Sequence, residues 1–318
     1  MSTNLVDNGL AVVFPGQGSQ SVGMLSDLAE KNAEVGFTFR IASEVLGYDL
    51  WDLVRNGPEE KLNLTQYTQP AMLAADVAAW RVWSKGTSAR PAWMAGHSLG
   101  EYAALVCSGA LAFEDAVRLV AERGRLMQEA VPPETGAMAA ILGLSDTQVV
   151  EVCAKASTET EVVAPANFNA PGQIVIAGHQ PAVARAIELG KAEGAKRAVL
   201  LPVSVPSHCP LMRSVAEKIH EMLAETAVKI PPIAVVHNVD VQSHSAPEVI
   251  RAVLEKQVYS PVRWAESILF MSQQGVSRFV ECGPGRVLSG LNKRIVPACR
   301  TEAVFDRNSL VKALELVQ

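Results

Sequence analysis

The fold is decided by residues 92–104, which read AWMAGHSLGEYAA from Ala92 to Ala104. An apolar run enters GHSLG at residues 96–100, a match to G-x-S-x-G, and small residues compatible with a helix follow directly. This is the sequence context of a nucleophile elbow, a sharp strand-to-helix turn in which glycines leave room around a strained central residue. The pattern predicts that the Ser98 hydroxyl projects from this turn. The alternative is a glycine-rich loop that carries an ordinary surface serine.

A serine in such a turn can attack an acyl group if backbone N–H groups stabilise the charge that develops on the acyl oxygen. Leu99 N–H is the nearest donor, because it lies where the following helix begins. In this architecture a second donor comes from the end of a neighbouring strand. The apolar run at residues 9–14 ends in PGQGSQ at 15–20, so Gln17 N–H is our candidate. The glycine spacing of this loop fits neither the dinucleotide fingerprint nor the Walker pattern, which argues against a phosphate site.

Composition narrows the class of protein. The chain has 318 residues, of which 49% are hydrophobic and 19% charged, as in compact globular proteins. Its net charge is -5 and it has no block of lysine and arginine, which argues against a nucleic-acid partner. Five scattered cysteines without a C-x-x-C pair argue against a disulfide framework and a zinc site. With no signal-peptide pattern and no apolar stretch of spanning length, we predict a cytoplasmic protein without membrane contact.

Apolar strands alternate with helical patterns in the first part of the chain. The predicted elements there are a strand at 9–14, helices at 25–46 and 68–83, the strand that enters the elbow, and a helix at 113–130. This alternation favours a mainly parallel sheet covered on both faces, of the α/β-hydrolase-like kind that carries a nucleophile elbow. Further along, a helix is expected to open at Pro210, and a strand at 277–282 runs into the GPG turn at 283–285.

A different order of elements occupies the middle of the chain. The patterns predict a strand, a helix, two strands, a helix and a strand at residues 136–143, 146–156, 162–167, 173–177, 181–190 and 198–205. This β-α-β-β-α-β order is the ferredoxin-like arrangement. We therefore predict a large catalytic α/β domain over residues 1–130 and 205–318, and an inserted small ferredoxin-like α+β subdomain over residues 131–204. A cleft between two such lobes is a common place for a ligand.

One arginine of the helix at 113–130 lies on the wrong face for a surface residue. The other charged residues share one face, where oppositely charged neighbours explain them as exposed pairs. Arg123 lies nearly opposite, between Val120 and Met127, where a guanidinium would be buried and would need an anion. Two interpretations remain open: a salt bridge to a buried Asp or Glu, or a fork that binds a substrate carboxylate.

His208 is the candidate general base. It lies between Pro206 and Pro210, and of the six histidines it alone precedes an expected helix entrance. The positive end of that helix dipole would disfavour the imidazolium and keep the ring able to accept a proton. The alternative is that His208 only caps the helix.

Several motifs occur together in one order. They are PGQGSQ at 15–20, TQPA at 68–71, GHSLGEY at 96–102, RG at 123–124, NFNAPGQ at 167–173, PSH at 206–208 and GPG at 283–285. Together they resemble the malonyl-CoA:acyl carrier protein transacylase family of fatty acid synthesis, over almost the whole chain. The resemblance implies ping-pong transfer of a malonyl group from malonyl-CoA to the phosphopantetheine thiol of acyl carrier protein, through a malonyl-serine.

The resemblance also implies roles for particular residues. Ser98 would be acylated, with His208 as its general base, and Arg123 would bind the malonyl carboxylate. The main-chain carbonyl of Gln257, and not an aspartate, would orient the histidine, so that the site is a dyad.

Further roles follow from the same resemblance. The N–H groups of Gln17 and Leu99 would form the oxyanion hole, and Gln173 and Arg197 would meet the pantetheine region of CoA. No metal, redox cofactor or prosthetic group is implied. Because acyl carrier proteins are acidic, Lys196 with Arg197 is a candidate basic docking patch. The rival functions are a serine hydrolase built from the same residues and a carrier-protein docking module without catalysis.

Overall fold

The larger sheet is parallel, and the strand Val6–Phe14, labelled β1, lies at its centre. The computed structural model describes residues 6–132, 135–203 and 205–318. The strands of this sheet, in spatial order, are β7 (Ala234–Val236), β2 (Arg90–Gly96), β1 (Val6–Phe14), β8 (Arg278–Cys282) and β9 (Arg300–Val304). Strand β1 is buried from Leu10 to Phe14, on both faces, which explains why it is a continuous apolar run. The mainly parallel α/β fold predicted from the sequence is confirmed.

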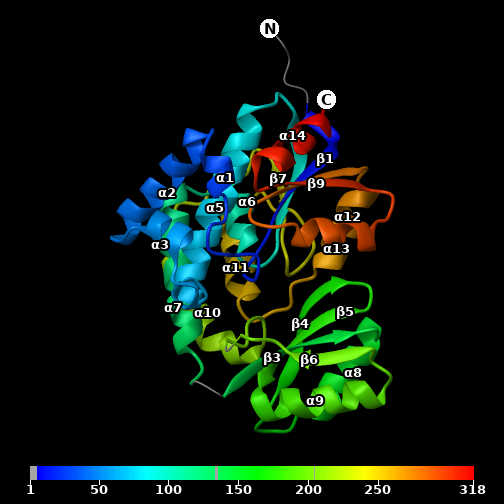
Figure 1. Cartoon of the computed structure of the whole chain (residues 1–318). Helices are drawn as coiled ribbons and strands as arrows, with labels where there is room; N and C mark the ends of the chain where they lie inside the picture. Colours follow the sequence, from blue (N-terminus) through cyan, green and yellow to red (C-terminus); the bar gives the residue numbers. More distant parts are fainter. Residues whose placement is uncertain (1–5, 133–134, 204) are drawn as a thin grey trace.

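Helices cover both faces of this sheet (Figure 1). Leu10, Val12 and Phe14 of β1 pack into the larger core cluster, and Ala11 and Val13 pack into a second cluster on the other face. The helices of the larger cluster are α1 (Ser26–Ala29), α2 (Ala33–Leu46), α3 (Leu50–Asn56), α4 (Glu59–Leu62), α5 (Thr65–Lys85), α6 (Gly100–Cys107), α7 (Phe113–Glu129), α10 (Arg213–Glu225), α11 (Pro247–Gln257) and α14 (Arg307–Glu315). Helices α12 (Trp264–Gln273) and α13 (Val287–Ile295) belong to the second cluster.

The smaller sheet is antiparallel. Its strands, in spatial order, are β4 (Val163–Ala170), β5 (Gln173–His179), β3 (Gly136–Leu142) and β6 (Arg197–Leu200). Two helices, α8 (Asp146–Ala156) and α9 (Gln180–Ala192), pack on one face and complete the ferredoxin-like arrangement that the sequence predicts. The opposite face carries Met138 and Ala177, which pack against Cys209, the residue that follows His208. The smaller sheet therefore adjoins the candidate site.

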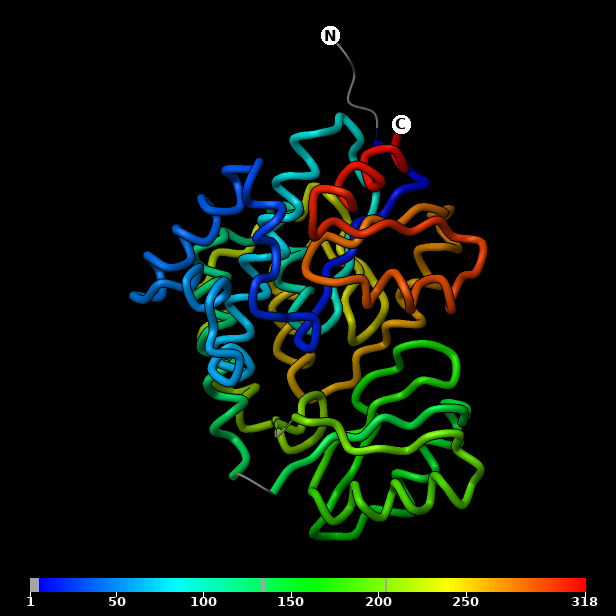
Figure 2. Tube along the Cα trace, viewed as in Figure 1, coloured from blue at the N-terminus to red at the C-terminus, as the bar shows by residue number. Residues whose placement is uncertain are grey.

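The two sheets are joined by backbone contacts as well as by the chain connections. Figure 2 shows that the chain passes from the part that contains the larger sheet to the smaller sheet after α7, and that it returns before α10. Phe168 N–H donates to Val262 O at 2.9 Å, and Val262 N–H donates to Ala166 O at 2.9 Å. The division at residues 130/131 and 204/205 stays a prediction, and residues 133–134 and 204 of the predicted subdomain lie outside the described residues. No helix of the described chain is long and apolar enough to cross a membrane.

Some predicted elements have different bounds in the structure. The helix predicted at 25–46 is two helices, α1 and α2, because the chain turns at 30–32, where the Asn32 side chain donates to Leu28 O at 2.8 Å. The helix predicted to open at Pro210 begins with a 3-10 turn, Pro210–Met212, before α10 starts at Arg213. The strand predicted at 198–205 is limited to β6. The elements that were not predicted are α3, α4, β7, α11, α12, β9 and α14.

Candidate active site

The turn at Ser98 is as tight as the sequence pattern requires. Ser98 lies between β2 and α6 with φ 53°, in the left-handed region that strains a residue with a side chain. A Cβ at Gly96 would lie 1.8 Å from the Gly100 carbonyl carbon, and a Cβ at Gly100 would lie 2.2 Å from Phe14 O. Only glycine fits at either position, and the serine between them is held at the start of α6.

Ser98 and His208 form a hydrogen-bonded pair. Ser98 Oγ lies 2.6 Å from His208 Nε2, and His208 Nδ1 lies 2.8 Å from the main-chain O of Gln257. Because a carbonyl oxygen only accepts, Nδ1 carries the proton and Nε2 is left to accept from the serine hydroxyl. His208 has φ 60°, so both members of the pair are in the left-handed region. This arrangement has the geometry of a nucleophile with its general base.

His208 is neutral for a reason that the sequence did not reveal. Its side chain is buried, and burial, followed by the nearby charge of Arg123, lowers its pKa from 6.5 to about 3. The helix entrance expected from the sequence is present as the 3-10 turn at Pro210–Met212, and its contribution to the neutral ring stays a prediction beside the effects of burial and Arg123. A neutral imidazole can accept the serine proton at any pH near neutrality.

The depressed pKa of His208 makes a prediction for pH dependence. Since its pKa is about 3, the histidine should stay deprotonated in the free enzyme far below its ordinary 6.5. We expect the rate of Ser98 acylation to be nearly unchanged between about pH 7.5 and about pH 5. The measurement is the rapid-quench burst of acyl-enzyme at each pH, and an inflection near the ordinary histidine pKa would contradict it. Stability should fall as pH drops below 6.5, because the unfolded chain then binds a proton that the folded chain does not.

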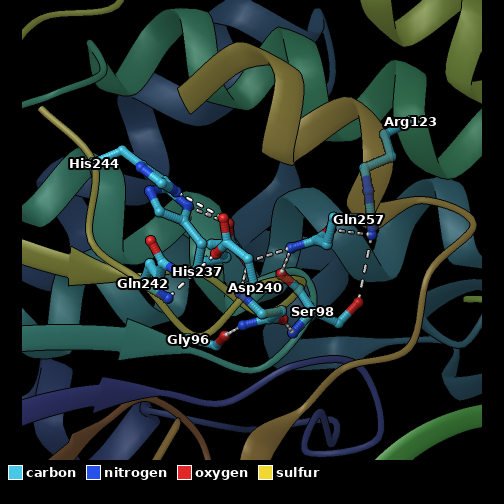
Figure 3. A network of polar contacts seen from close by, with 10 residues as sticks. Gly96, Ser98, Arg123, His237, Asp240, Gln242, His244 and Gln257 are labelled. Carbon is cyan, nitrogen blue, oxygen red and sulfur yellow. Dashed lines mark hydrogen bonds and ion pairs between the residues drawn. The ribbon is translucent and has the colours of Figure 1, made fainter. Parts of the chain in front are cut away.

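Arg123 points at the serine and lacks a carboxylate partner (Figure 3). The side chain is 1% exposed, and its NH1 donates to Gln69 Oε1 at 2.8 Å. Its NH2 donates to Gln257 Oε1 at 3.0 Å and lies 3.4 Å from Ser98 Oγ, while its Nε has no partner. Among the described residues no carboxylate forms an ion pair with it, so the structure does not form the buried salt bridge that was one of the two interpretations. Burial lowers the pKa of Arg123, but a guanidinium keeps its charge at neutral pH.

The two candidate oxyanion donors lie on neighbouring segments. A Cβ at Gly16 would lie 2.4 Å from His97 O, so the loop that carries Gln17 passes directly beside the elbow. In the described part of the chain neither Gln17 N–H nor Leu99 N–H has an acceptor. Both groups are free to donate to a substrate oxygen, and their role stays a prediction.

The side chains that hold the elbow were not found from the sequence. Asn238, just beyond β7, accepts from Ser98 N–H at 2.8 Å and donates to Gly96 O at 2.7 Å. Glu101 accepts from Asn238 N–H at 3.1 Å and lies 2.7 Å from His237 Nδ1, with both side chains fully buried. The one sequence feature that could have pointed to these side chains is the position of Glu101, in the first turn after G-x-S-x-G. Asn238 is 140 residues away from Ser98, and no local pattern marks it.

Gln173 and Arg197 lie apart from these contacts, on the smaller sheet. Both residues pair with Leu142 of β3, one from each side, and therefore share a face of that sheet. Gln173 Oε1 accepts from Arg294 of α13, and Arg197 is exposed. The structure does not bring them into contact with Ser98. Their role toward pantetheine, and that of Lys196 with Arg197 in docking, stay predictions.

An α/β sheet that presents a serine in a strained elbow, paired with a neutral histidine, defines a protein equipped for acyl chemistry at serine. The match of residues 11–296 to the acyl transferase domain model identifies the family more closely. This chain belongs to the acyl transferase family.

The individual relatives are similar over their whole length. The malonyl CoA-acyl carrier protein transacylase of Escherichia coli K12 is 54% identical over 306 residues, which cover 96% of this chain and 99% of the relative. That of Bacillus subtilis is 43% identical, with 97% of each chain covered. Among solved structures, an acyl carrier protein S-malonyltransferase from Vibrio cholerae has a TM-score of 0.93 at 56% identity, covering 96% of this chain and 99% of its own. A malonyl-transacylase solved in complex with its type II PKS acyl-carrier protein has a TM-score of 0.94 at 54% identity, with the same coverage.

Proposed function

We propose that this protein is an acyl-carrier-protein S-malonyltransferase. It takes a malonyl group from malonyl-CoA and passes it to the phosphopantetheine thiol of an acyl carrier protein, as a step in fatty acid biosynthesis. The names of the full-length relatives and of the complex with a carrier protein support this substrate and this partner. The observation that carries the proposal is the guanidinium of Arg123, which is buried within 3.4 Å of Ser98 Oγ without a carboxylate partner.

The first half-reaction is the acylation of Ser98. His208 Nε2 takes the hydroxyl proton as Ser98 Oγ attacks the thioester carbon, and the N–H groups of Gln17 and Leu99 receive the negative charge on the carbonyl oxygen. The C–S bond then breaks, and His208 returns its proton to the CoA sulfur. In the second half-reaction the carrier thiol gives its proton to His208 and attacks the malonyl-serine. The C–O bond to Ser98 then breaks, and His208 returns the proton to Ser98 Oγ, which restores the free serine.

Arg123 gives the site its preference for a malonyl group. A guanidinium binds a carboxylate with two parallel hydrogen bonds, and in a buried site this pair is strong. The NH2 group, which lies 3.4 Å from Ser98 Oγ, faces the position of the acyl group, and the guanidinium has hydrogens beyond those that it donates to Gln69 and Gln257. An acetyl group would leave them without a partner.

The proposed reaction also bears on cofactors and on the cellular compartment. The acyl carbon keeps its oxidation state from the CoA thioester to the serine ester to the carrier thioester, so no redox step occurs and we propose that no prosthetic group takes part. The cysteines are all free, which agrees with a reducing compartment such as the cytoplasm: Cys107, Cys153, Cys209, Cys282 and Cys299.

The fate of the acyl-enzyme tests this proposal. Mixing the protein with malonyl-CoA alone should give a stable malonyl adduct in intact-protein mass spectra, and adding holo acyl carrier protein should move the malonyl group to the carrier. Rapid release of free malonate without a carrier would instead indicate a serine hydrolase. Binding of the carrier without any adduct would indicate a docking module that has no catalytic activity.

A further inference from the structure

Glu101 is a fully buried acidic residue next to the nucleophile that the reaction itself does not use. Its Oε1 lies 2.7 Å from His237 Nδ1, and its Oε2 accepts from Asn238 N–H at 3.1 Å and from Gln257 Nε2 at 2.8 Å. The Asn238 N–H can only donate, and so can the amide NH2 of Gln257. Both Oε2 contacts are therefore hydrogen bonds that the carboxylate accepts.

The side chain of Gln257 connects this carboxylate to Arg123. Figure 3 shows the contact of Gln257 with Arg123. Its Oε1 accepts from Arg123 NH2 at 3.0 Å, and its Nε2 donates both to Glu101 Oε2 at 2.8 Å and to Ser98 O at 3.0 Å. Arg123 has only donors, whereas the carboxylate and the Ser98 carbonyl have only acceptors. The amide therefore has one orientation that satisfies all of its neighbours, with its oxygen toward the guanidinium.

We propose that Glu101 is a positioning residue, which acts through the side-chain amide of Gln257 to hold Arg123 beside Ser98. In this arrangement no carboxylate of the described residues contacts the guanidinium of Arg123 directly. Glu101 and Gln257 thereby set the preference of the site for acyl groups that carry a carboxylate. This inference depends on the malonyl transfer proposed above. It concerns the side chain of Gln257, whereas the contact with His208 is made by the main chain of the same residue.

The separation of the two charges is the physical basis of this role. A carboxylate in direct contact would occupy the guanidinium donors and compete with a substrate carboxylate for them. A guanidinium with no anion nearby would be costly to bury. Placing the carboxylate one amide group away attracts the guanidinium through a low-dielectric interior and leaves its remaining donors free. Gln69, a second neutral acceptor at 2.8 Å, contacts the guanidinium without compensating its charge.

Exchanging Glu101 for glutamine tests the inference, because Glu101→Gln keeps the shape and removes the acceptor-only group. Gln257 Nε2 then donates to a neutral amide oxygen at best, so the charge-assisted hydrogen bond to Glu101 is lost and the amide that contacts Arg123 is held less firmly. We expect the ratio of malonyl to acetyl acylation rates to fall by about tenfold, as for the loss of one charge-assisted hydrogen bond. The rates are measured by quenched-flow mass spectrometry of the acyl-enzyme with each CoA thioester.

Gln257→Leu gives a second test that does not depend on how Glu101→Gln folds. It removes the amide while keeping the main-chain carbonyl that contacts His208, so it should lower malonyl acylation more than acetyl acylation and thus lower the same ratio. The matched control is Glu255→Gln on the same helix. Among the described residues the polar partner of its carboxylate is the exposed His220, so this variant should keep the wild-type ratio.

The outcomes separate this inference from the proposed function. If the wild-type protein forms no malonyl adduct, the proposed function fails. If the wild type is labelled and both variants keep or exceed its malonyl-to-acetyl ratio, only the positioning role is overturned. Equal losses of both rates in both variants would also overturn it, because they would indicate a structural role for these side chains.

Discussion

Replacing Ser98 with alanine should abolish the malonyl adduct and lower malonyl transfer to the carrier by roughly a thousandfold or more. Ser98 Oγ is the only atom of the site that is proposed to form a bond with the acyl group, and His208 Nε2 at 2.6 Å has no other hydroxyl to activate in the described site. The measurement is the intact mass of the protein after incubation with malonyl-CoA. A small remaining rate is expected, because binding and the oxyanion donors are unaffected.

The control for this prediction is a neighbouring serine. Ser207 precedes His208 in the chain, and its backbone N–H bonds to Val205 O. Ser207→Ala should therefore be labelled like the wild type. Undiminished labelling of Ser98→Ala would remove Ser98 from the mechanism and leave the elbow as a structural turn.

Replacing Arg123 with alanine should lower malonyl acylation by about a hundredfold while reducing acetyl acylation far less, since a buried pair of guanidinium and carboxylate is among the stronger polar interactions. The guanidinium lies 3.4 Å from Ser98 Oγ and is held by two neutral amide oxygens. Only a substrate with a carboxylate benefits from it. The comparison is between acylation rates with malonyl-CoA and acetyl-CoA. Arg123→Lys should give an intermediate result, because it keeps the charge and loses the planar fork.

Arg125→Ala is the matched control for Arg123→Ala. Arg125 lies two residues further along α7, is partly exposed, and pairs with Glu122 and Glu129. Exposed pairs of this kind contribute at most about 1 kcal/mol, so this variant should behave like the wild type. Equal losses of malonyl and acetyl acylation in Arg123→Ala would show that the arginine has a structural role only. Thermal melting of each variant separates loss of rate from loss of fold.

Short-range patterns were sufficient for the smaller sheet, for the three central strands of the larger sheet and for the elbow, whereas the edge strands β7 and β9 were not predicted. Parallel strands buried on both faces are continuous apolar runs, so the strand at 9–14 could be recognised without a partner. The G-x-S-x-G turn depends on contacts between near neighbours, such as the 1.8 Å approach that a Cβ at Gly96 would make to the Gly100 carbonyl carbon. Boundaries were less predictable where a single side chain ends a helix, as at Asn32, or where a strand loses its partner, as after Leu200.

The sequence patterns could not predict contacts between residues that are far apart in the chain. The sequence left two interpretations of Arg123 open, because periodicity shows that a side chain is buried and does not show what it contacts. Its actual partners, Gln69 and Gln257, lie 54 and 134 residues away in the chain. The low pKa of His208 likewise comes first from burial and then from Arg123, neither of which the local sequence around His208 revealed.

By itself the amino-acid sequence determined the class of fold, the strained turn at Ser98 and the presence of one arginine on an apolar helix face, since each depends on residues within one or two turns of backbone. The tertiary structure alone decided that this arginine is left without a carboxylate, that His208 is neutral because it is buried, and that Glu101 reaches Arg123 only through an amide. The physical reason is that the charge and protonation of a buried group depend on whichever side chains the whole fold places around it.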